Sequence, residues 1–187
     1  MSHDRISNVT SWVRKFAPLV QPNTTVLDLA CGGGRHTEFF LARGHQVIAL
    51  DKDTSGLDAH AGDPACQVTT FDLESSNLAI SNQSEVIYSE QLPFFGRNLQ
   101  CIVVVNYLYR PLMSALIKAL SPGGILIYQT FMAGNERYGR PKNADFLLSP
   151  LELANTFNPE CDQIDFFEGF VSAPKRAVIQ CYCGRKR

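Results

Sequence analysis

The fold of this chain is decided by one stretch of its sequence, TTVLDLACGGG at residues 24–34. Residues 24–30 are mostly apolar or β-branched, which predicts a buried strand. Three consecutive glycines follow, and residues 35–43 have the character of a helix that Gly44 can cap. The stretch therefore predicts a strand, a glycine loop and a helix in direct succession. Backbone N–H groups at the start of such a helix attract anions.

Further strands follow this unit and alternate with helices. The apolar stretches that predict strands are 46–50, 66–71, 100–106 and 125–131. Before the first strand, apolar residues at helical spacing predict an N-terminal helix within residues 1–21. This alternation favours a parallel sheet that is covered by helices on both faces and joined by right-handed crossovers.

The segments between these strands contain two expected helices and one irregular region. A short helix is expected at about residues 54–61. Pro111 opens a second helix, and SPGG at 121–124 predicts a turn into the next strand. Residues 73–98 are polar in their first half and predict a loop with one short helix. The buried stripe of the second helix is formed by Leu112, Met113, Leu116, Ile117 and Leu120.

The C-terminal part departs from the parallel pattern. SPLE at 149–152 has the spacing of a capping box with proline at the first helical position, so a helix should run to about Phe157. Two strands follow at 163–171 and 177–183. The five residues 172–176 between them are too few for a parallel crossover, which predicts an antiparallel pair. The expected fold class is α/β, with a doubly wound seven-stranded mixed sheet.

The composition fits one domain, residues 1–187, with enough apolar residues to bury a core. The 45% hydrophobic content excludes global disorder, and a formal net charge of -1 gives no field that would attract nucleic acid. No apolar run approaches the length of a membrane span, and the polar N-terminus lacks a signal-peptide core. We expect a cytoplasmic monomer or homodimer with six reduced cysteines, no membrane association and no nucleic-acid partner.

Aspartates lie at the ends of three successive predicted strands: Asp28, Asp51 and Asp72. Carboxylates at the C-terminal edge of a parallel sheet line its ligand crevice, although each could instead cap a helix. A dinucleotide fingerprint requires a third glycine where this chain has Thr37, and an apolar residue where it has Asp28. The match to that fingerprint is therefore imperfect.

The segment DLACGGG at 28–34 resembles the first motif of class I S-adenosylmethionine-dependent methyltransferases. The resemblance implies a Rossmann-like methyltransferase fold with strand order 3-2-1-4-5-7-6 and one antiparallel strand. It also implies S-adenosylmethionine as cofactor, S-adenosylhomocysteine as product and no metal. In the family, the residue at Asp51 holds the ribose hydroxyls and those at Asp72 and Leu73 meet the adenine. The cofactor-binding residues implied are Asp28, Ala30, Cys31, Gly32, Gly34, Asp51, Lys52, Asp72, Leu73 and Asn106.

Three further segments are similar to the tellurite-resistance-type subgroup of small methyltransferases: GRH at 34–36, NYLYRP at 106–111 and GNERYGRP at 134–141. This similarity implies methyl transfer to a small-molecule acceptor and does not name the acceptor. The alternatives are an NAD(P)-binding oxidoreductase of Rossmann type and a noncatalytic module that binds S-adenosylmethionine.

The catalytic candidates follow the fourth and fifth predicted strands. Tyr107 and Tyr109 could wall the acceptor pocket or hold a proton, or could serve only in packing. Residues 132–148 form a candidate active-site lid, in which Arg140 could hold an anionic group of the acceptor. Asn106 either faces the cofactor or caps a helix, and His36 has either a structural role or that of a base.

Two features outside the motif have simple explanations. Cys181 and Cys183 face the same side of one strand, but no second pair of ligands accompanies them, so we expect no zinc. The basic tail GRKR at 184–187, with Lys175 and Arg176, is a local hint of an RNA or anionic partner. A solvated terminus explains the tail more simply.

Overall fold

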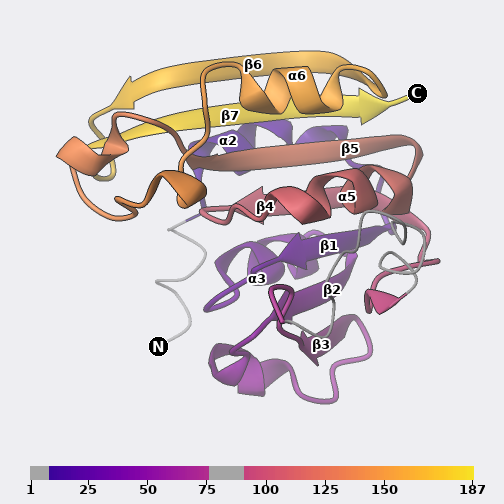
Figure 1. Cartoon of the computed structure of the whole chain (residues 1–187). Coiled ribbons are helices and arrows are strands. Elements are labelled where there is room, and N and C mark those ends of the chain that lie inside the picture. The colour runs from indigo at the N-terminus through magenta and orange to yellow at the C-terminus, as the bar shows by residue number, and fades with distance from the viewer. Residues whose placement is uncertain (1–8, 76–90) are drawn as a thin grey trace.

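The computed structural model describes residues 9–75 and 91–187, and its centre is a seven-stranded sheet of order β3-β2-β1-β4-β5-β7-β6 (Figure 1). Neighbouring strands are parallel except at β7, which runs antiparallel to both β5 and β6. The implied strand order and the single antiparallel strand are therefore confirmed. The strands are β1 (Thr25–Leu29), β2 (Gln46–Asp51), β3 (Cys66–Thr70), β4 (Leu99–Val105), β5 (Leu120–Phe131), β6 (Cys161–Val171) and β7 (Ala177–Lys186).

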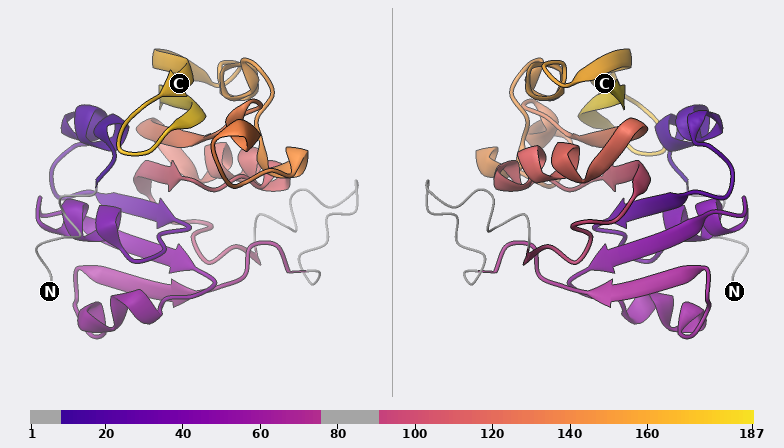
Figure 2. Two further views of the ribbon diagram at one scale, coloured as in Figure 1. Left: turned by 90° about the vertical axis from the view of Figure 1, so that its left-hand side faces the viewer. Right: turned by 90° about the vertical axis from the view of Figure 1, so that its right-hand side faces the viewer.

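Helices cover both faces of the sheet, as Figure 2 shows. One face carries α2 and α3, and the other carries α5 and α6. The α-helices are α2 (Ser11–Phe16), α3 (Arg35–Leu41), α5 (Met113–Ala119) and α6 (Glu152–Phe157). Short 3-10 helices connect them: η1 (Ala17–Leu19), η2 (Ser55–His60), η4 (Arg110–Leu112), η5 (Asn135–Arg137) and η6 (Ala144–Phe146).

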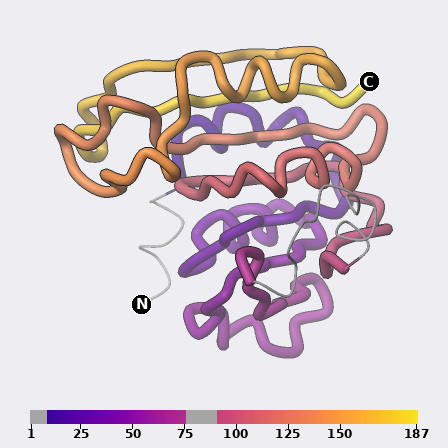
Figure 3. The backbone as a smooth tube through the Cα atoms, viewed as in Figure 1, coloured from indigo at the N-terminus to yellow at the C-terminus, as the bar shows by residue number. Residues whose placement is uncertain are grey.

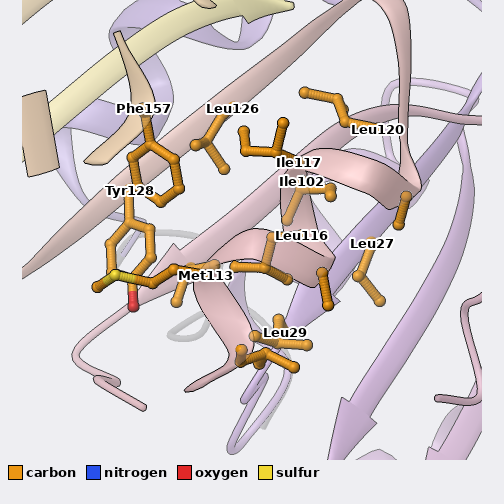
Figure 4. Packing of buried hydrophobic residues seen from close by; sticks show 14 of the residues in the cluster. Leu27, Leu29, Ile102, Met113, Leu116, Ile117, Leu120, Leu126, Tyr128 and Phe157 are labelled. Atoms are coloured by element: carbon orange, nitrogen blue, oxygen red, sulfur yellow. The ribbon is translucent and has the colours of Figure 1, made fainter. Parts of the chain in front are cut away.

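Successive side chains along each strand point to opposite faces of the sheet, so they pack alternately into the two cores. In β1, Val26 packs with the helices α2 and α3, whereas Leu27 and Leu29 pack with α5. Figure 4 shows the second of these cores, in which Tyr128 and Phe157 lie beside Met113. Strand β4 is apolar almost throughout because both of its faces are covered.

The N-terminal helix is confirmed, with residues 1–8 of its expected range outside the described residues. The hydroxyl of Thr10 accepts a hydrogen bond from the N–H of Val13 and so caps α2. The indole N–H of Trp12 donates to the carbonyl of Tyr182 at 3.1 Å, which ties this helix to β7.

The expected turn at residues 121–124 lies inside β5. Leu120 pairs with Leu99, and the next pair is Ile125 with Cys101, so the register shifts across the four residues between Leu120 and Ile125. Gly123 has a φ of +77° there. The strand thus begins directly after α5 and contains an irregularity where a separate turn was expected.

Helix α6 begins later than its sequence signal predicts. The backbone N–H of Ser149 donates to the carboxylate of Glu152 at 2.7 Å, which is one half of the expected capping box. Leu151, however, has a φ of +59°, and its N–H donates to Glu168. A left-handed residue cannot belong to a right-handed helix, so α6 starts at Glu152 and ends at Phe157 as expected.

The basic tail is part of the sheet and is not a solvated terminus, which corrects that interpretation. Strand β7 extends to Lys186, whose ammonium donates to the carbonyls of Ile117 and Leu120 at 2.6 and 2.7 Å. Arg185 donates to the carbonyl of Gly123. Arg187 makes an ion pair with Asp162 and donates to three carbonyls.

The remaining expectations concern cysteines, metal and membrane. All six cysteines are buried and free, in agreement with the sequence analysis. Across 9–75 and 91–187, no cluster of three or more His, Cys, Asp or Glu side chains could hold a metal ion. No helix in these same ranges is long and apolar enough to span a membrane. The short helix expected within 73–98 falls largely on 76–90, outside the described residues.

Candidate functional site

The loop after β1 is a tight turn that glycine makes possible. The N–H of Gly34 donates to the carbonyl of Cys31 at 3.0 Å. Gly34 is the N-cap of α3 and has a φ of +80°. A Cβ atom on Gly34 would collide with the side chain of Leu57 in η2, whereas a Cβ atom on Gly33 would meet nothing within 4 Å. Gly34 is therefore required by the fold, and Gly33 faces open space.

Asp28 lies beneath this loop and does not face a cavity. Only 1% of its surface is exposed, and the hydroxyl of Thr37 donates to its carboxylate at 2.7 Å. Burial raises the pKa of Asp28 to about 6. Asp28 therefore fastens α3 to β1, and with Gly34 it is one of two expected cofactor residues that line neither cavity.

Asp51 joins the end of β2 to the glycine loop. One oxygen of its carboxylate accepts from the N–H of Gly32 at 2.8 Å, and the other accepts from the N–H of Asp53 at 3.1 Å. Because β1 and β2 are parallel neighbours, their carboxyl ends meet at the same sheet edge. The carboxylate thus lies at the junction of the two strand ends.

A first cavity of about 270 Å³ opens at this edge. Its charged lining consists of three carboxylates and one ammonium group, and Asp72 accepts from the N–H of Glu74 at 2.9 Å. The lining residues are Ala30, Asp51, Lys52, Phe71, Asp72, Leu73, Glu74, Asn106 and Tyr107.

A second cavity of about 460 Å³ adjoins the first, because both are lined by Ala30 and Asn106. These two residues have φ values of +53° and +60°, and the N–H of Asn106 donates to the carbonyl of Gln129 at 2.8 Å. Left-handed residues other than glycine carry strain that is typical of functional sites. The lining residues are Ala30, Cys31, Gly32, Gly33, Arg35, His36, Val105 and Asn106.

Burial controls the protonation of the groups in the second cavity. His36 is 3% exposed, and burial together with the charge of Arg35 lowers its pKa to about 3, so its imidazole is neutral. Among the residues that the structure describes, the ring nitrogen Nε2 of His36 has no hydrogen-bond partner. Burial raises the pKa of the Cys31 thiol, which is therefore protonated at neutral pH.

The three catalytic candidates lie in different places. Tyr107 lines the first cavity, and its carbonyl accepts from the hydroxyl of Tyr128 at 3.0 Å. Tyr109 is half-buried and packs against the core on the α5 face, so it lines neither cavity. Arg140 is exposed and also lines neither cavity.

The segment 132–148 leaves the end of β5 and returns to α6, as Figure 3 shows in orange. Its ends are held together, because Ala133 donates to the carbonyl of Leu148 and Leu148 donates to that of Phe131. Asn135 is 1% exposed and accepts from the N–H of Val178 at 3.1 Å. The segment is thus anchored at its base, and a lid motion stays a prediction.

Several lining residues were not singled out in the sequence. Gly33 lies within the glycine triplet, and Phe71 and Glu74 lie within two residues of Asp72. Their closeness in sequence to a motif residue is the signal that could have identified them as lining residues. Arg35 follows the glycines directly, and Val105 precedes Asn106. Only the packing of the sheet edge shows that these five residues line the two cavities.

Several known structures share this fold. The TehB protein of Haemophilus influenzae is 16% identical with a TM-score of 0.71, over 96% of this chain and 63% of that one. A TehB-like methyltransferase of Corynebacterium glutamicum is 17% identical with a TM-score of 0.64, over 96% and 89%. A Burkholderia thailandensis 1,6-didemethyltoxoflavin-N1-methyltransferase, with 1,6-didemethyltoxoflavin and S-adenosylhomocysteine bound, is 16% identical with a TM-score of 0.66, over 99% and 79%.

These likenesses concern the fold alone. The chain spans 63% of the length of the Haemophilus protein. No protein-family model matches the sequence, and a search of curated proteins finds no match either.

Proposed function

We propose that this chain, whose Rossmann-like fold is shared with class I methyltransferases, transfers a methyl group from S-adenosylmethionine to a small-molecule acceptor. One observation carries the proposal. Asp51 and Asp72, from the ends of two neighbouring strands, line a cavity that adjoins the glycine-loop cavity at Ala30 and Asn106. One elongated ligand can therefore lie across both cavities.

The first cavity suits the adenosine half of such a ligand. Carboxylates accept hydrogen bonds from hydroxyl groups, so Asp51 can hold the ribose and Asp72 an amino group of the base. Phe71 adds an apolar surface. A carboxylate at the end of β2 would hold the ribose of a dinucleotide equally well, so Asp51 does not discriminate between the two cofactors.

The packing of α3 argues against a dinucleotide fingerprint. That fingerprint needs a third glycine so that helix and strand can approach closely. Here Thr37 occupies the position, is fully buried and bonds to Asp28. The space that a glycine leaves empty is thus filled by a hydrogen-bonded side chain.

When bound, the cofactor would supply an electrophilic methyl group on a sulfonium centre. The residues of this chain would align the acceptor with that methyl group and exclude water from it. An acceptor oxygen or protonated nitrogen must lose a proton, whereas a soft sulfur, selenium or tellurium nucleophile needs no base. His36, whose pKa is lowered to about 3, is a poor proton acceptor. Of the three catalytic candidates, Tyr107 is the one that lines a cavity.

A tellurite-resistance-type enzyme is the finer assignment that we propose. It is supported by two TehB-like structures among the similar folds and by the motif segments at 34–36, 106–111 and 134–141. A cytoplasmic location is proposed with it, since all six thiols are free and buried, as suits a reducing compartment. That the protein is a monomer or homodimer stays a prediction.

A thermal-shift titration with S-adenosylmethionine, S-adenosylhomocysteine and NADH in parallel tests the cofactor. A ligand at 100 times its Kd adds about 2.7 kcal/mol, which corresponds to roughly 5–10 °C in a chain of this size. We expect a shift with the two sulfur nucleosides and none with NADH. A shift with NADH alone would overturn the proposal.

Turnover is tested separately by the release of S-adenosylhomocysteine over a panel of thiol, selenol, tellurite, amine and carboxylate acceptors. Release with any class above the rate without acceptor supports methyl transfer. Tight cofactor binding without release over the whole panel would favour a noncatalytic binding module.

A further inference from the structure

Strand β6 forms one outer edge of the sheet (Figure 1). Within residues 9–75 and 91–187, it pairs with β7 along one side and with no strand along the other. Its 11 residues make it roughly twice as long as a usual strand. Its register against β7 shifts between Gln163 and Asp165 and is regular from there to Val171. The free side of such a strand presents a row of backbone N–H and C=O groups with which another strand can pair.

Large apolar side chains are exposed along β6. The exposed fractions are 40% for Ile164, 39% for Phe167 and 50% for Phe170. Tyr138 of the 132–148 segment extends this surface, because its ring centroid lies 5.0 Å from that of Phe170 and the residue is itself 44% exposed. The opposite edge strand, β3, has five residues and no large exposed apolar side chain. Proteins usually protect a sheet edge by short length or by charge, so the apolar edge at β6 indicates a surface that another chain covers.

The sequence of β6 is complementary to itself in an antiparallel register. A two-fold axis at Phe167 places this residue opposite its own copy, and Ile164 opposite Phe170 of the second copy. The three exposed apolar side chains of the strand then all meet apolar side chains, and cross-strand pairs of this kind stabilise sheets. An axis at Phe166 would instead set Ile164 and Phe167 against carboxylates. The apolar pattern therefore favours the axis at Phe167, with residues 163–171 paired.

The same register keeps the negative charges of β6 apart. Asp165 lies opposite Gly169 of the second copy, and Glu168 lies opposite Phe166. Because glycine has no side chain, the ion pair between Asp165 and Lys15 at 2.6 Å can stay in place. An axis at Asp165 or at Glu168 would set two carboxylates directly opposite one another, which is destabilising. The charges and the apolar side chains of the strand thus favour one and the same axis.

We propose that two copies of this chain associate through their β6 strands, antiparallel about a two-fold axis at Phe167, so that their sheets become continuous. The shared surface is one strand with its flanking side chains, so we expect a dissociation constant in the micromolar range. No residue of β6 lines either cavity. The inference therefore does not depend on the proposed function, and each can fail without the other.

Sedimentation velocity tests the association. Wild-type protein, measured over a series of micromolar concentrations, should show an equilibrium between one chain and two. Phe167→Asp sets two carboxylates against each other at the axis and should raise the Kd of the dimer by at least about a hundredfold. A wild type that stays monomeric at every concentration would overturn the inference, and so would a dimer that Phe167→Asp leaves equally strong.

A matched variant controls for the added charge. Phe95→Asp makes the same substitution at a phenylalanine that is 42% exposed and lies before β4, away from β6 in the sheet. It should leave the Kd of the dimer within about threefold of the wild-type value. Far-ultraviolet circular dichroism checks the fold of both variants. An equal loss of the dimer in folded Phe95→Asp would show that net charge, and not the β6 edge, controls association, which would contradict the inference.

Cysteine substitution tests the register, and it does not require Phe167→Asp to fold. All six native cysteines are buried, so a cysteine on the free edge of β6 is the accessible thiol. Phe167→Cys should give a disulfide-linked dimer under mild oxidation, because directly opposite Cβ atoms lie about 4.5–5.5 Å apart. Phe170→Cys should not, since its own copy lies six positions away, at about 20 Å. Non-reducing electrophoresis compares the two. No cross-linked dimer with Phe167→Cys, or equal yields in both variants, would refute the proposed pairing.

Discussion

Burial gives Asp28 and Asp51 different roles although the two residues are chemically identical. Asp28 is 1% exposed and bonded to Thr37, so its carboxylate belongs to the packing between β1 and α3. Asp51 lines the first cavity, and its carboxylate accepts a hydrogen bond from the backbone N–H of Gly32. The two residues should therefore respond differently to substitution, one in stability and the other in ligand binding.

Asp51→Ala should weaken the binding of S-adenosylhomocysteine by about 1–3 kcal/mol, because it removes a charged acceptor at the cavity. Isothermal titration calorimetry measures the change. Asp53→Ala is the control, since Asp53 is exposed, bonds to Ser55 and lines neither cavity. Equal affinity of folded Asp51→Ala and wild type would contradict the map of the site.

Asp28 should give the stability of the protein a measurable pH dependence. Its pKa is about 6 in the folded chain against 3.8 for an ordinary aspartate, so the folded state binds more protons between these pH values. Stability from this group is present below pH 3.8 and is lost as the pH rises to 6, by about 3 kcal/mol in all.

The measurement compares urea unfolding of the wild type with that of Asp28→Asn from pH 4 to pH 7. The advantage of the wild type should shrink as the pH rises and then level off above pH 6.5. His36 acts in the opposite direction, because its lowered pKa adds stability as the pH rises toward 6.5. The difference between the two proteins removes that contribution. A difference that is constant over this pH range would contradict a raised pKa for Asp28.

At the scale of elements, the sheet edge is assembled from loops that side chains hold in place. The guanidinium of Arg110 binds both oxygens of Glu152 at 2.6 and 3.1 Å and donates to the carbonyls of Asp145 and Leu147. Glu152 also accepts from the N–H of Ser149. Arg110 thereby joins the C-terminal part of the 132–148 segment to the loop that follows β4 and contains Tyr107.

Arg110→Gln should lower the free energy of unfolding by about 1–2 kcal/mol, since it breaks a bidentate pair at a partly exposed site. It should also speed tryptic cleavage after Arg137 and Lys142, which are exposed in the 132–148 segment. Arg97→Gln, at an exposed position outside this network, is the control. Unchanged cleavage rates in Arg110→Gln would mean that the segment is held by its other anchors alone.

The glycine loop offers a matched pair of substitutions. Gly34→Ala forces alanine into a left-handed backbone, at about 1–2 kcal/mol, and displaces Leu57 as well, so it should lower the midpoint of thermal unfolding. Gly33→Ala meets nothing within 4 Å and should change stability by no more than about 0.5 kcal/mol. Because Gly33 lines the second cavity, its variant should bind S-adenosylhomocysteine more weakly. The reverse order of stabilities would refute this division of roles.

At the scale of the whole molecule, helix α2 and residues 185–187 both bond to the region around β7. The indole of Trp12 in α2 donates to the carbonyl of Tyr182. Lys186 donates to the carbonyls of Ile117 in α5 and Leu120 in β5, Arg185 donates to a further carbonyl of β5, and Arg187 pairs with Asp162. The antiparallel strand β7 lies between β5 and β6, so loss of its end would expose two neighbours at once.

Removal of residues 185–187 should therefore cost about 2–4 kcal/mol of unfolding free energy, through the loss of several charge-assisted hydrogen bonds. Urea unfolding monitored by fluorescence measures it. The double variant Lys175→Gln with Arg176→Gln removes two exposed charges from the β6–β7 turn and should change stability by no more than about 0.5 kcal/mol. A truncated chain as stable as the full one would show that the tail has no structural role.

The sequence by itself determined the order of strands and helices. Hydrophobic periodicity and the placement of glycines depend only on residues that are close together in the sequence. It also indicated most lining residues of the first cavity, since Asp51, Asp72 and Leu73 stand at strand ends and parallel strands end at one edge. Only the tertiary structure decided how each charge is used. It buried Asp28 against Thr37, placed Arg35 and His36 in the second cavity, left Tyr109 and Arg140 outside both and fixed the basic tail to backbone carbonyls. The physical reason is that burial, pKa and hydrogen-bond partners depend on contacts between residues far apart in the chain, which no local pattern specifies.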